Sequence, residues 1–466
     1  MPLRLFNSMG RRLQVFTPLR EGEVRMYTCG PTVWNYAHIG NFRTFVFEDL
    51  LRRYLRFKGY RVTQVMNITD VEDKIIKGMK RFGKSRKELS DFFEAAFKED
   101  LAALGVEPAD IYPRATEHID EMVTLINRLL AGGYAYRSDD GSYYYDISKF
   151  PRYGALSGIR PGELKAGARV AQDEYEKDEA SDFALWKAWD PDDGEVYWET
   201  ELGKGRPGWH IECSAMSMKY LGEEFDIHTG GVDNKFPHHE NEIAQSEAAT
   251  GKKFVSYWLH SAHLSVSGAA MHKSVGNEVY LRDLLKAGWD PKCIRLFLAA
   301  GRYRDQADLT DENLKQATAQ CERLRDFVGR LRSAEGAPKA GAELAAKLLA
   351  GFEAAMDDDL NTADALASVF DIVKKGNTLM DSGRLGAEAA GALLSALRRI
   401  DEVLGIMTLE EDVLPERTAK LIADREEARR RRDFAAADRI RAQLLDEGIV
   451  VEDSPKGTVW KRKRAG

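Results

Sequence analysis

The sequence predicts an α/β domain built on a parallel sheet and interrupted by an insertion, followed by a helical bundle and a small α+β domain. Three observations support this prediction. Residues 24–66 have the pattern of a strand, an amphipathic helix and a second strand, which is long enough for a parallel crossover. From Thr310 the pattern becomes helical and rich in Ala and Leu. After Pro415 the charge balance turns basic.

The first unit alternates apolar strands with an apolar helical stripe. The first strand ends at the turn signal Gly30-Pro31-Thr32, and Gly59 ends the helix. The predicted elements are a strand over Val24–Cys29, a helix over Phe42–Leu55 and a strand over Val62–Met66.

The junction between the first strand and the helix could bind an anion. His38 and Gly40 lie there, backbone N–H groups at a helix start point toward an anion, and Gly lets a ligand approach closely. The alternative is that His38 is a cap or a surface residue, the usual role of a histidine in front of a helix. Neither a dinucleotide fingerprint nor a P-loop occurs in this unit.

An insertion separates the two halves of the sheet. Ala115–Tyr134 is expected to be helical and Ser142–Ile147 to be a strand, whereas Lys165–Asp182 is charged and loop-like and Asp190–Gly194 is a turn. The predicted domains are residues 1–114 and 201–309 for the two halves of the sheet domain, 115–200 for the insertion, 310–411 for the bundle and 412–466 for the last domain.

The second half of the sheet domain contains a histidine-rich stretch. Seven of the nine histidines lie between positions 210 and 272. His238 and Glu242 have the i,i+4 spacing that puts two side chains on one face of a helix, and Pro237 suits the first turn of such a helix. With Cys213 upstream, these side chains are candidate zinc ligands. The alternative is that Cys213 is a small buried apolar residue and the histidines are core or surface groups.

A loop downstream of this stretch could hold phosphates. Tyr257–His263 leads into a glycine-flanked segment that carries the pair Lys273-Ser274. A solvated turn is the alternative for this segment.

The remainder is helical until the last domain. Four helices form the expected bundle, with a linker at Ser333–Gly341. The tail from Arg417 to Gly466 carries 14 Lys/Arg against 9 Asp/Glu. A basic surface with an exposed aromatic residue is typical of a nucleic-acid contact, although Arg429–Arg432 could also be a solvated face. We expect helices at Leu314–Leu331, Ala342–Ala355, Asn361–Met380, Ala387–Leu404, Arg417–Arg432 and Phe434–Glu447, and strands at Ile449–Val451 and Thr458–Trp460 joined by a turn at Ser454–Gly457.

The composition is that of an ordinary globular protein. The chain has 466 residues, of which 44% are hydrophobic and 31% charged, and this length suggests about three domains. It has no apolar run long enough to span a membrane, and its N-terminus has too few apolar residues for a signal peptide. The four cysteines have no paired spacing, which favours a reducing, cytoplasmic location. Because the net charge is −7, a nucleic-acid partner would need a local basic patch.

These stretches resemble the class I aminoacyl-tRNA synthetases, and cysteinyl-tRNA synthetases in particular. The resemblance covers the whole chain and is most specific in Cys29, GWHIEC and FPHHENE. It implies a Rossmann-like catalytic domain, adenylation of L-cysteine by ATP with Mg²⁺, and transfer to cysteine tRNA. The matching segments are YTCGPTVWNYAHIGN, NITDVEDKII, PRATEHI, DFALWK, GKGRPGWHIECSAM, FDIHTGGVDNKFPHHENEIAQS and AMDDDLNT, with ADRIR and TVW in the tail.

The resemblance assigns two ATP signatures. HIGN at residues 38–41 stands for the family's first signature, HIGH, with His38 and Gly40 facing the nucleotide. AMHKS at residues 270–274 stands for the second signature, KMSKS, in which Ala270 replaces the first lysine. One of two cations is therefore missing, and Lys273 or a nearby basic side chain would have to supply more of the charge stabilisation. The implied catalytic residues are His38, Gly40, Asn41, Lys273 and Ser274, and the implied ATP contacts also include Gly230, Gly231 and Asp233.

The resemblance also supplies a fourth metal ligand, Cys29, at the end of the first strand. Cys29, Cys213, His238 and Glu242 would then bind one zinc ion per chain, from both halves of the sheet. The substrate thiolate is a further ligand in this family. The implied contacts with cysteine are Cys29, Thr69 and Trp209, of which Trp209 would pack against the small side chain.

The implied macromolecular partner is cysteine tRNA, docked by the bundle and by the basic tail at the anticodon. Trp460, Arg429 and Arg432 are the expected contacts of the tail. We expect a monomer that does not associate with membranes.

Two other functions fit part of the sequence. A paralogous ligase that joins cysteine to an amino sugar in thiol biosynthesis shares the zinc and ATP signatures, but it lacks the anticodon-binding tail that this chain has. A non-catalytic RNA-binding relative with a structural zinc would fit Ala270, but the pair Lys273-Ser274 and the complete ligand set argue against it.

Overall fold

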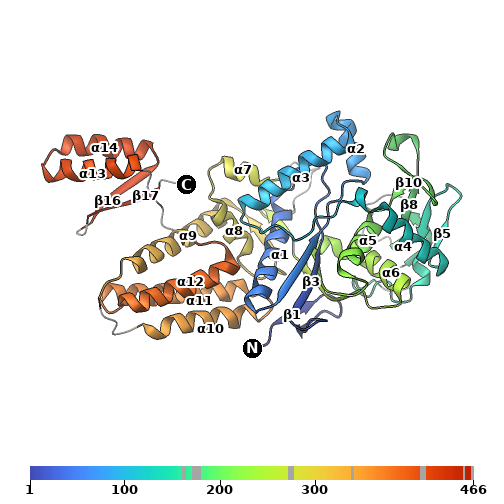
Figure 1. Cartoon of the computed structure of the whole chain (residues 1–466), viewed down its shortest axis with the longest axis horizontal. Helices are drawn as coiled ribbons and strands as arrows, with labels where there is room; N and C mark the ends of the chain where they lie inside the picture. Colours follow the sequence, from blue (N-terminus) through green and yellow to red (C-terminus); the bar gives the residue numbers. More distant parts are fainter. Residues whose placement is uncertain are drawn as a thin grey trace.

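The computed structural model describes residues 1–159, 164–170, 180–270, 278–336, 341–409, 416–454 and 457–462 of the chain. Figure 1 shows an elongated molecule, with the insertion on one side of the central α/β domain and the helical bundle and C-terminal unit on the other. Among the described residues, no helix is long and apolar enough to cross a lipid bilayer.

A four-stranded parallel sheet forms the centre of the molecule. Its strand order is β12-β11-β3-β4, so the two halves of the domain meet where β11 pairs with β3. The two strands predicted in the first unit are confirmed. The strands are β3 (Glu23–Thr28), β4 (Arg61–Met66), β11 (Phe225–Gly231) and β12 (Val255–Ser261).

The two faces of the sheet have separate apolar cores. Along β3, Met26 belongs to the core that contains α1, whereas the next residue, Tyr27, belongs to the core that contains α5 and α6. This alternation follows from the period of two in a strand. The covering helices are α1 (Ile39–Phe57), α5 (Trp209–Leu221) and α6 (His238–Thr250).

The predicted helix after β3 is confirmed, but it begins at Ile39 instead of Phe42. The backbone N–H of His38 donates to Asn41 Oδ1 at 3.1 Å, and this cap starts the helix before its apolar stripe begins. Gly40 and Asn41 therefore lie in the first turn of α1.

Two helices follow β4 at the edge of the sheet. α2 (Asp73–Phe82) starts where Glu72 accepts a hydrogen bond from the backbone N–H of Lys74 at 2.8 Å. α3 (Arg86–Ala103) starts with a capping box formed by Ser85 and Glu88. Local caps thus place the first turn of α2 near the carboxyl end of β4.

The insertion folds around a second, mostly antiparallel sheet. Its strand order is β5-β6-β8-β10-β9, and β7 pairs with β8. The predicted helix is confirmed in its central part, as α4 (Ile119–Ala131), and the turn predicted at Asp190–Gly194 contains a short 3-10 turn. The strands are β5 (Ala135–Arg137), β6 (Tyr143–Tyr145), β7 (Leu164–Val170), β8 (Ala180–Ala188), β9 (Trp198–Thr200) and β10 (Gly203–Pro207).

One prediction for the insertion is wrong. The charge of Lys165–Asp182 predicts a loop, but β7 occupies its first part and runs parallel to β8, with Val170 opposite Phe183. Backbone hydrogen bonds to a neighbouring strand hold β7, and these bonds do not require apolar side chains. The part over residues 171–179 lies outside the described residues.

Shorter elements complete the catalytic domain. An N-terminal hairpin packs near β12, and a small three-stranded sheet with two helices leads to the bundle. These elements are β1 (Arg4–Asn7), β2 (Arg12–Val15), β13 (Leu264–Val266), β14 (Ala269–Ala270), β15 (Ala307–Leu309), α7 (Leu281–Lys286) and α8 (Pro291–Ala299).

Four helices form the bundle, as predicted. Their apolar faces join the core on the α1 side of the sheet, so the bundle and the catalytic domain share one apolar core. Arg295 of α8 also ties them together, because its Nη2 lies 2.5 Å from Asp49 Oδ2 of α1 and its Nε donates to Leu404 O at 2.7 Å. The helices are α9 (Asp311–Arg332), α10 (Ala342–Met356), α11 (Thr362–Asp381) and α12 (Ala387–Leu404).

The C-terminal unit has its own small core. The predicted helices and strands are confirmed, and the turn between the strands lies partly outside the described residues. Two helices pack with a hairpin around Ile422, Leu444, Ile449 and Val451. The elements are α13 (Glu416–Arg430), α14 (Phe434–Asp446), β16 (Ile449–Ser454) and β17 (Gly457–Arg462).

Candidate active site and metal centre

A cavity of about 500 Å³ opens at the carboxyl ends of β3 and β11. Its walls come from the loop between β3 and α1, the first turns of α1, α2 and α5, and the segment after β11. This edge of a parallel sheet is where α/β domains bind ligands. The lining residues used below are Cys29, His38, Asn41, Lys74, Trp209, Gly231, Asp233 and Glu278.

The four predicted metal ligands meet beside this cavity. Cys29 follows β3, Cys213 lies on α5, and His238 and Glu242 share one face of α6. One ligand atom from each lies within 4.8 Å of all the others. Two sulfurs, an imidazole and a carboxylate are a donor set suited to zinc.

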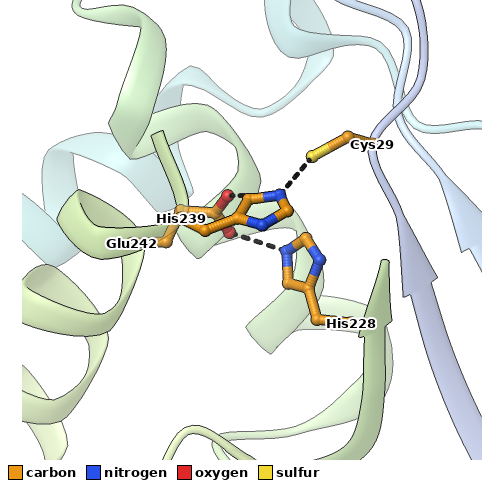
Figure 2. Close-up of side chains that lie close together, drawn as sticks. All are labelled: Cys29, His228, His239 and Glu242. Atoms are coloured by element: carbon orange, nitrogen blue, oxygen red, sulfur yellow. Dashed lines mark hydrogen bonds and ion pairs between the residues drawn. The ribbon is translucent and has the colours of Figure 1, made fainter. Parts of the chain in front are cut away.

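Two further histidines lie in the same cluster. His228 Nε2 lies 2.9 Å from Glu242 Oε2, and His239 Nε2 lies 3.2 Å from Cys29 Sγ (Figure 2). With Cys29 and Glu242, these histidines form a second group whose ligand atoms also lie within 4.8 Å of one another. The cluster therefore offers two overlapping sets of possible ligands.

The carboxylate of Glu242 favours the predicted set. Glu242 is fully buried, and His228 already bonds its Oε2, whereas Oε1 has no hydrogen-bond partner among the described residues. Oε1 lies 3.2 Å from His238 Nε2, and His238 Nδ1 lies 3.0 Å from His210 Nδ1. A buried carboxylate oxygen without a donor is costly, and a cation bound by Oε1 and His238 would remove that cost. His228 then orients the carboxylate from behind.

Burial favours the neutral imidazole at four histidines in and beside the cluster. It lowers the pKa of His210, His238 and His260 to about 3, and it lowers the pKa of His239 well below its usual range. A neutral imidazole is the form that binds a metal. Burial also raises the pKa of Cys29, so a thiolate there needs a nearby cation to stabilise it.

Two tryptophans hold the histidine rings in place. Trp209, the first residue of α5, stacks on His238 with ring centroids 4.2 Å apart, and Trp258 of β12 stacks on His228 at 4.6 Å. Trp209 also lines the cavity, as Cys29 does.

The predicted nucleotide contacts border another part of the cavity. His38 and Asn41 line it at the start of α1, and Gly231 and Asp233 line it after β11. His38 Nδ1 is buried and has no hydrogen-bond partner among the described residues, and burial lowers the pKa of His38. A neutral ring at a helix start is suited to a phosphate or ribose oxygen.

Gly40 and Gly230 do not line the cavity. A Cβ on Gly230 would lie 2.9 Å from His239 Cε1, so the missing side chain lets β11 approach the histidine cluster. The predicted nucleotide contacts of these two glycines stay predictions.

Thr69 is also set back from the cavity. It is buried after β4, where its Oγ1 donates to Glu212 Oε2 at 3.1 Å and accepts from Asn67 Nδ2 at 3.1 Å. Its contact with the substrate therefore stays a prediction. Lys273 and Ser274 lie outside the described residues, which end at Ala270 of β14 and resume at Glu278.

The predicted tRNA contacts belong to the C-terminal unit. Arg429 and Arg432 are exposed at the end of α13, and Phe434, which starts α14, is 58% exposed. Trp460 lies on β17 opposite Val451 of β16. The unit therefore presents basic side chains beside an exposed aromatic ring.

Comparisons with known proteins cover nearly the whole chain. Family models match residues 15–319 (tRNA synthetases class I (C) catalytic domain), 351–408 (DALR domain) and 411–460 (cysteinyl-tRNA ligase anticodon binding domain). The cysteine–tRNA ligase of Solibacter usitatus is 48% identical over 99% of this chain and 100% of the relative. That of Koribacter versatilis is 45% identical over 99% of this chain and 100% of the relative. The chain belongs to the cysteinyl-tRNA synthetase family.

Solved structures confirm the fold expected of a cysteinyl-tRNA synthetase. Methionyl-tRNA synthetase of Mycobacterium tuberculosis in complex with methionyl-adenylate matches with a TM-score of 0.63 and 16% identity, covering 82% of this chain and 92% of that chain. A second structure of that enzyme gives a TM-score of 0.64 at 15% identity, covering 89% and 96%. At this identity the likeness shows the fold alone, which is the predicted Rossmann-like class I architecture.

The site also contains residues to which the sequence analysis assigned no role. His228 and His239 contact the ligands, and Lys74 and Glu278 line the cavity. The only local signal for His239 is its i,i+3 spacing to Glu242 on α6. Only the tertiary fold brings Lys74 and Glu278 to the cavity, so their spacing in the sequence could not predict this position.

Proposed function

We propose that this chain ligates L-cysteine to cysteine tRNA through a cysteinyl adenylate, using ATP with Mg²⁺ and one zinc ion. The observation that supports this most directly is the set of four donor atoms within 4.8 Å, beside a cavity that Trp209 and His38 also line. Family membership makes the chain a ligase of the class I synthetase type.

In the first step, a carboxylate oxygen of cysteine attacks the α-phosphorus of ATP, and the bond to pyrophosphate breaks. The protein has little covalent chemistry to perform, so positioning and charge stabilisation dominate. His38 and the backbone N–H groups at the start of α1 would bind the phosphates, while Asp233 would bind the ribose. Lys273 would stabilise the charge that develops on the leaving pyrophosphate.

In the second step, a terminal ribose hydroxyl of the tRNA attacks the carbonyl carbon of the adenylate and AMP leaves. The enzyme must hold the adenylate in place while a polynucleotide end enters the same cavity. The bundle and the C-terminal unit would dock the rest of the tRNA, with Arg429, Arg432 and Trp460 near the anticodon.

Cys29, Cys213, His238 and Glu242 would hold the zinc, and the two overlapping ligand sets would both place it beside Cys29 and Glu242. When bound, zinc favours the deprotonated form of a coordinated thiol, whereas a serine hydroxyl is a weaker zinc ligand. The stacked pair of Trp209 and His238 would confine the side chain next to these ligands. This arrangement would select cysteine during adenylation.

Two assays on the purified chain test the proposal. Cysteine-dependent ATP–pyrophosphate exchange measures the first step, and charging of cysteine tRNA measures both steps. We expect activity in both assays. Exchange without charging would favour a ligase that uses an amino sugar, and the absence of exchange would favour a non-catalytic RNA-binding protein.

A monomeric, cytoplasmic protein is part of the same proposal. All four cysteines are free thiols in the structure, in keeping with a reducing compartment. Analytical ultracentrifugation should give a single species near the chain mass of 52.4 kDa.

A further inference from the structure

The cavity has an unusual charge balance for a site that must bind phosphates. Of the described residues that line it, Asp233 and Glu278 are acidic, and Lys74 is the single Lys or Arg. Both substrates of the proposed transfer step, the adenylate and the tRNA, carry phosphate. Lys74 is therefore the one lysine or arginine of the described cavity lining that could pair with a phosphate, either of the adenylate or of the tRNA.

The sheet topology separates Lys74 from the predicted ribose contacts Gly231 and Asp233. Lys74 lies in the first turn of α2, which follows β4, whereas Gly231 and Asp233 follow β11. In the order β12-β11-β3-β4, strand β3 lies between the two. Cys29, at the end of β3, marks the position of the cysteine substrate. Lys74 thus lies on the opposite side of Cys29 from the predicted ribose contacts, whereas the predicted phosphate contacts at the start of α1 follow β3.

The insertion holds the start of α2 in place. The Asp73 carboxylate lies 3.1 Å from Lys187 Nζ on β8 and 2.6 Å from Arg206 Nη2 on β10. Arg206 Nε also donates to Asp193 Oδ1 at 2.8 Å. These partly buried ion pairs join α2 to the insertion at the residue that precedes Lys74. Strand β10 then leads directly to Trp209 at the start of α5.

We propose that Lys74 binds a backbone phosphate of the 3′-terminal nucleotides of the tRNA during the transfer step. With the ribose on the β11 side and the phosphates and cysteine at the end of β3, the β4 side next to the insertion is the part of the cavity that remains for the third substrate. A single-stranded polynucleotide end brings one negative charge per nucleotide there, and a lysine anchored on a clamped helix is suited to it. The inference rests on the proposed function and adds a tRNA-binding residue to it.

Lys74→Met and a matched control test this assignment. Methionine keeps most of the side-chain length but removes the ammonium group. Lys77→Met is the control, because Lys77 is exposed on the same helix and does not line the cavity. Lys74→Arg keeps the positive charge and should restore most of the loss. If Lys74→Met does not fold, as judged by its thermal unfolding, Lys74→Gln carries the same test.

Three measurements distinguish the possible ligands of Lys74. Single-turnover transfer from preformed cysteinyl adenylate should slow by roughly 10- to 100-fold in Lys74→Met at limiting tRNA, the scale of a lost hydrogen bond to a charged group. The fold-loss in the rate of pyrophosphate exchange should be at least about ten times smaller than the fold-loss in the rate of transfer. The salt dependence of the tRNA-limited rate should weaken by about 0.7 in log–log slope, the value for one single-strand phosphate contact.

Equal losses in exchange and transfer would overturn the proposal and assign Lys74 to ATP. Unchanged transfer in Lys74→Met would overturn it as well. Failure of the proposed function has a different outcome, because the unmodified chain would then not charge cysteine tRNA at all.

Discussion

The candidate metal ligands and the predicted tRNA contacts of the C-terminal unit lie in opposite settings. Cys213, His238 and Glu242 are at most 1% exposed, and the cluster is tied to α5, α6 and the central strands. Arg429 and Arg432 are exposed on a unit whose core has only a few buried side chains. The predicted ligands for the small substrate are thus buried, and the predicted contacts for the large partner are exposed.

This difference predicts two kinds of response to mutation. A buried charge or ligand interacts strongly and has no water to replace a lost partner, so each removal has a large effect that salt hardly changes. Exposed charges are screened, so each removal has a small effect that depends on salt. The following experiments test this contrast, from the largest expected effect to the smallest.

Removal of a buried ligand should have the largest effect. Cys213→Ala should lose most of the roughly one zinc per chain and slow pyrophosphate exchange by more than about 10³-fold, beyond the 10- to 100-fold typical of residues that only support ligands. Metal analysis and exchange kinetics measure this. Cys293→Ala is the control, since Cys293 is an equally buried cysteine of α8. Full metal content in Cys213→Ala with normal exchange would refute the ligand assignment.

The second effect is discrimination between cysteine and serine. Shape alone distinguishes a single group by about 1–3 kcal/mol. If the cluster selects a thiolate, exchange should favour cysteine by at least about 10³-fold, or about 4 kcal/mol. Exchange rates with each amino acid at matched enzyme and ATP give the ratio. A ratio under about a hundredfold would leave the metal without a demonstrated part in selection.

Removal of the Lys273 side chain should have an effect of intermediate size. Because Ala270 replaces the other signature lysine, Lys273→Ala should slow adenylation by roughly 10²-fold, the scale of a lost transition-state charge contact. The affinity for cysteine should barely change, since the predicted cysteine contacts do not include Lys273. Exchange kinetics with titrated cysteine check both expectations, and an unaltered rate would mean that another cation serves the phosphates.

Truncation after Glu411 removes the whole C-terminal unit. Its core is separate from the two larger cores, so the catalytic domain should stay folded and exchange should remain close to normal. Charging at limiting tRNA should fall by roughly tenfold or more and become less sensitive to salt, because phosphate contacts are lost. Normal charging by the truncated chain would rule out a role of this unit in tRNA binding.

Single arginine changes on that unit should have the smallest effects. Arg429→Gln and Arg432→Gln should each weaken tRNA binding by a few-fold and reduce the salt slope by about 1, as expected for one phosphate contact. Lys252→Gln is the control, because Lys252 is an exposed lysine of the catalytic domain that pairs with Glu223. A hundredfold loss from either arginine would contradict the contrast and point to a buried contact in the complex.

The sequence by itself predicted the elements and three of the four candidate metal ligands, Cys213, His238 and Glu242. Apolar periodicity predicted β3, β4 and the bundle helices, because the spacing of apolar residues along a strand or helix can be recognised within a short stretch of sequence. The i,i+4 spacing of His238 and Glu242 likewise needs only one helix. The resemblance then added Cys29, which no spacing could connect to residues more than 180 positions away.

Tertiary structure decided what depends on contacts between distant segments. His239 contacts Cys29 although 210 residues separate them in the sequence. His228 bonds one carboxylate oxygen of Glu242 and leaves Oε1 without a hydrogen-bond partner among the described residues. The charged strand β7 formed because its backbone pairs with β8. Lys74 faces the cavity because strand order puts β4 beside β3. Such contacts arise from the sheet topology and long-range packing, and neither is encoded in the local periodicity of side chains.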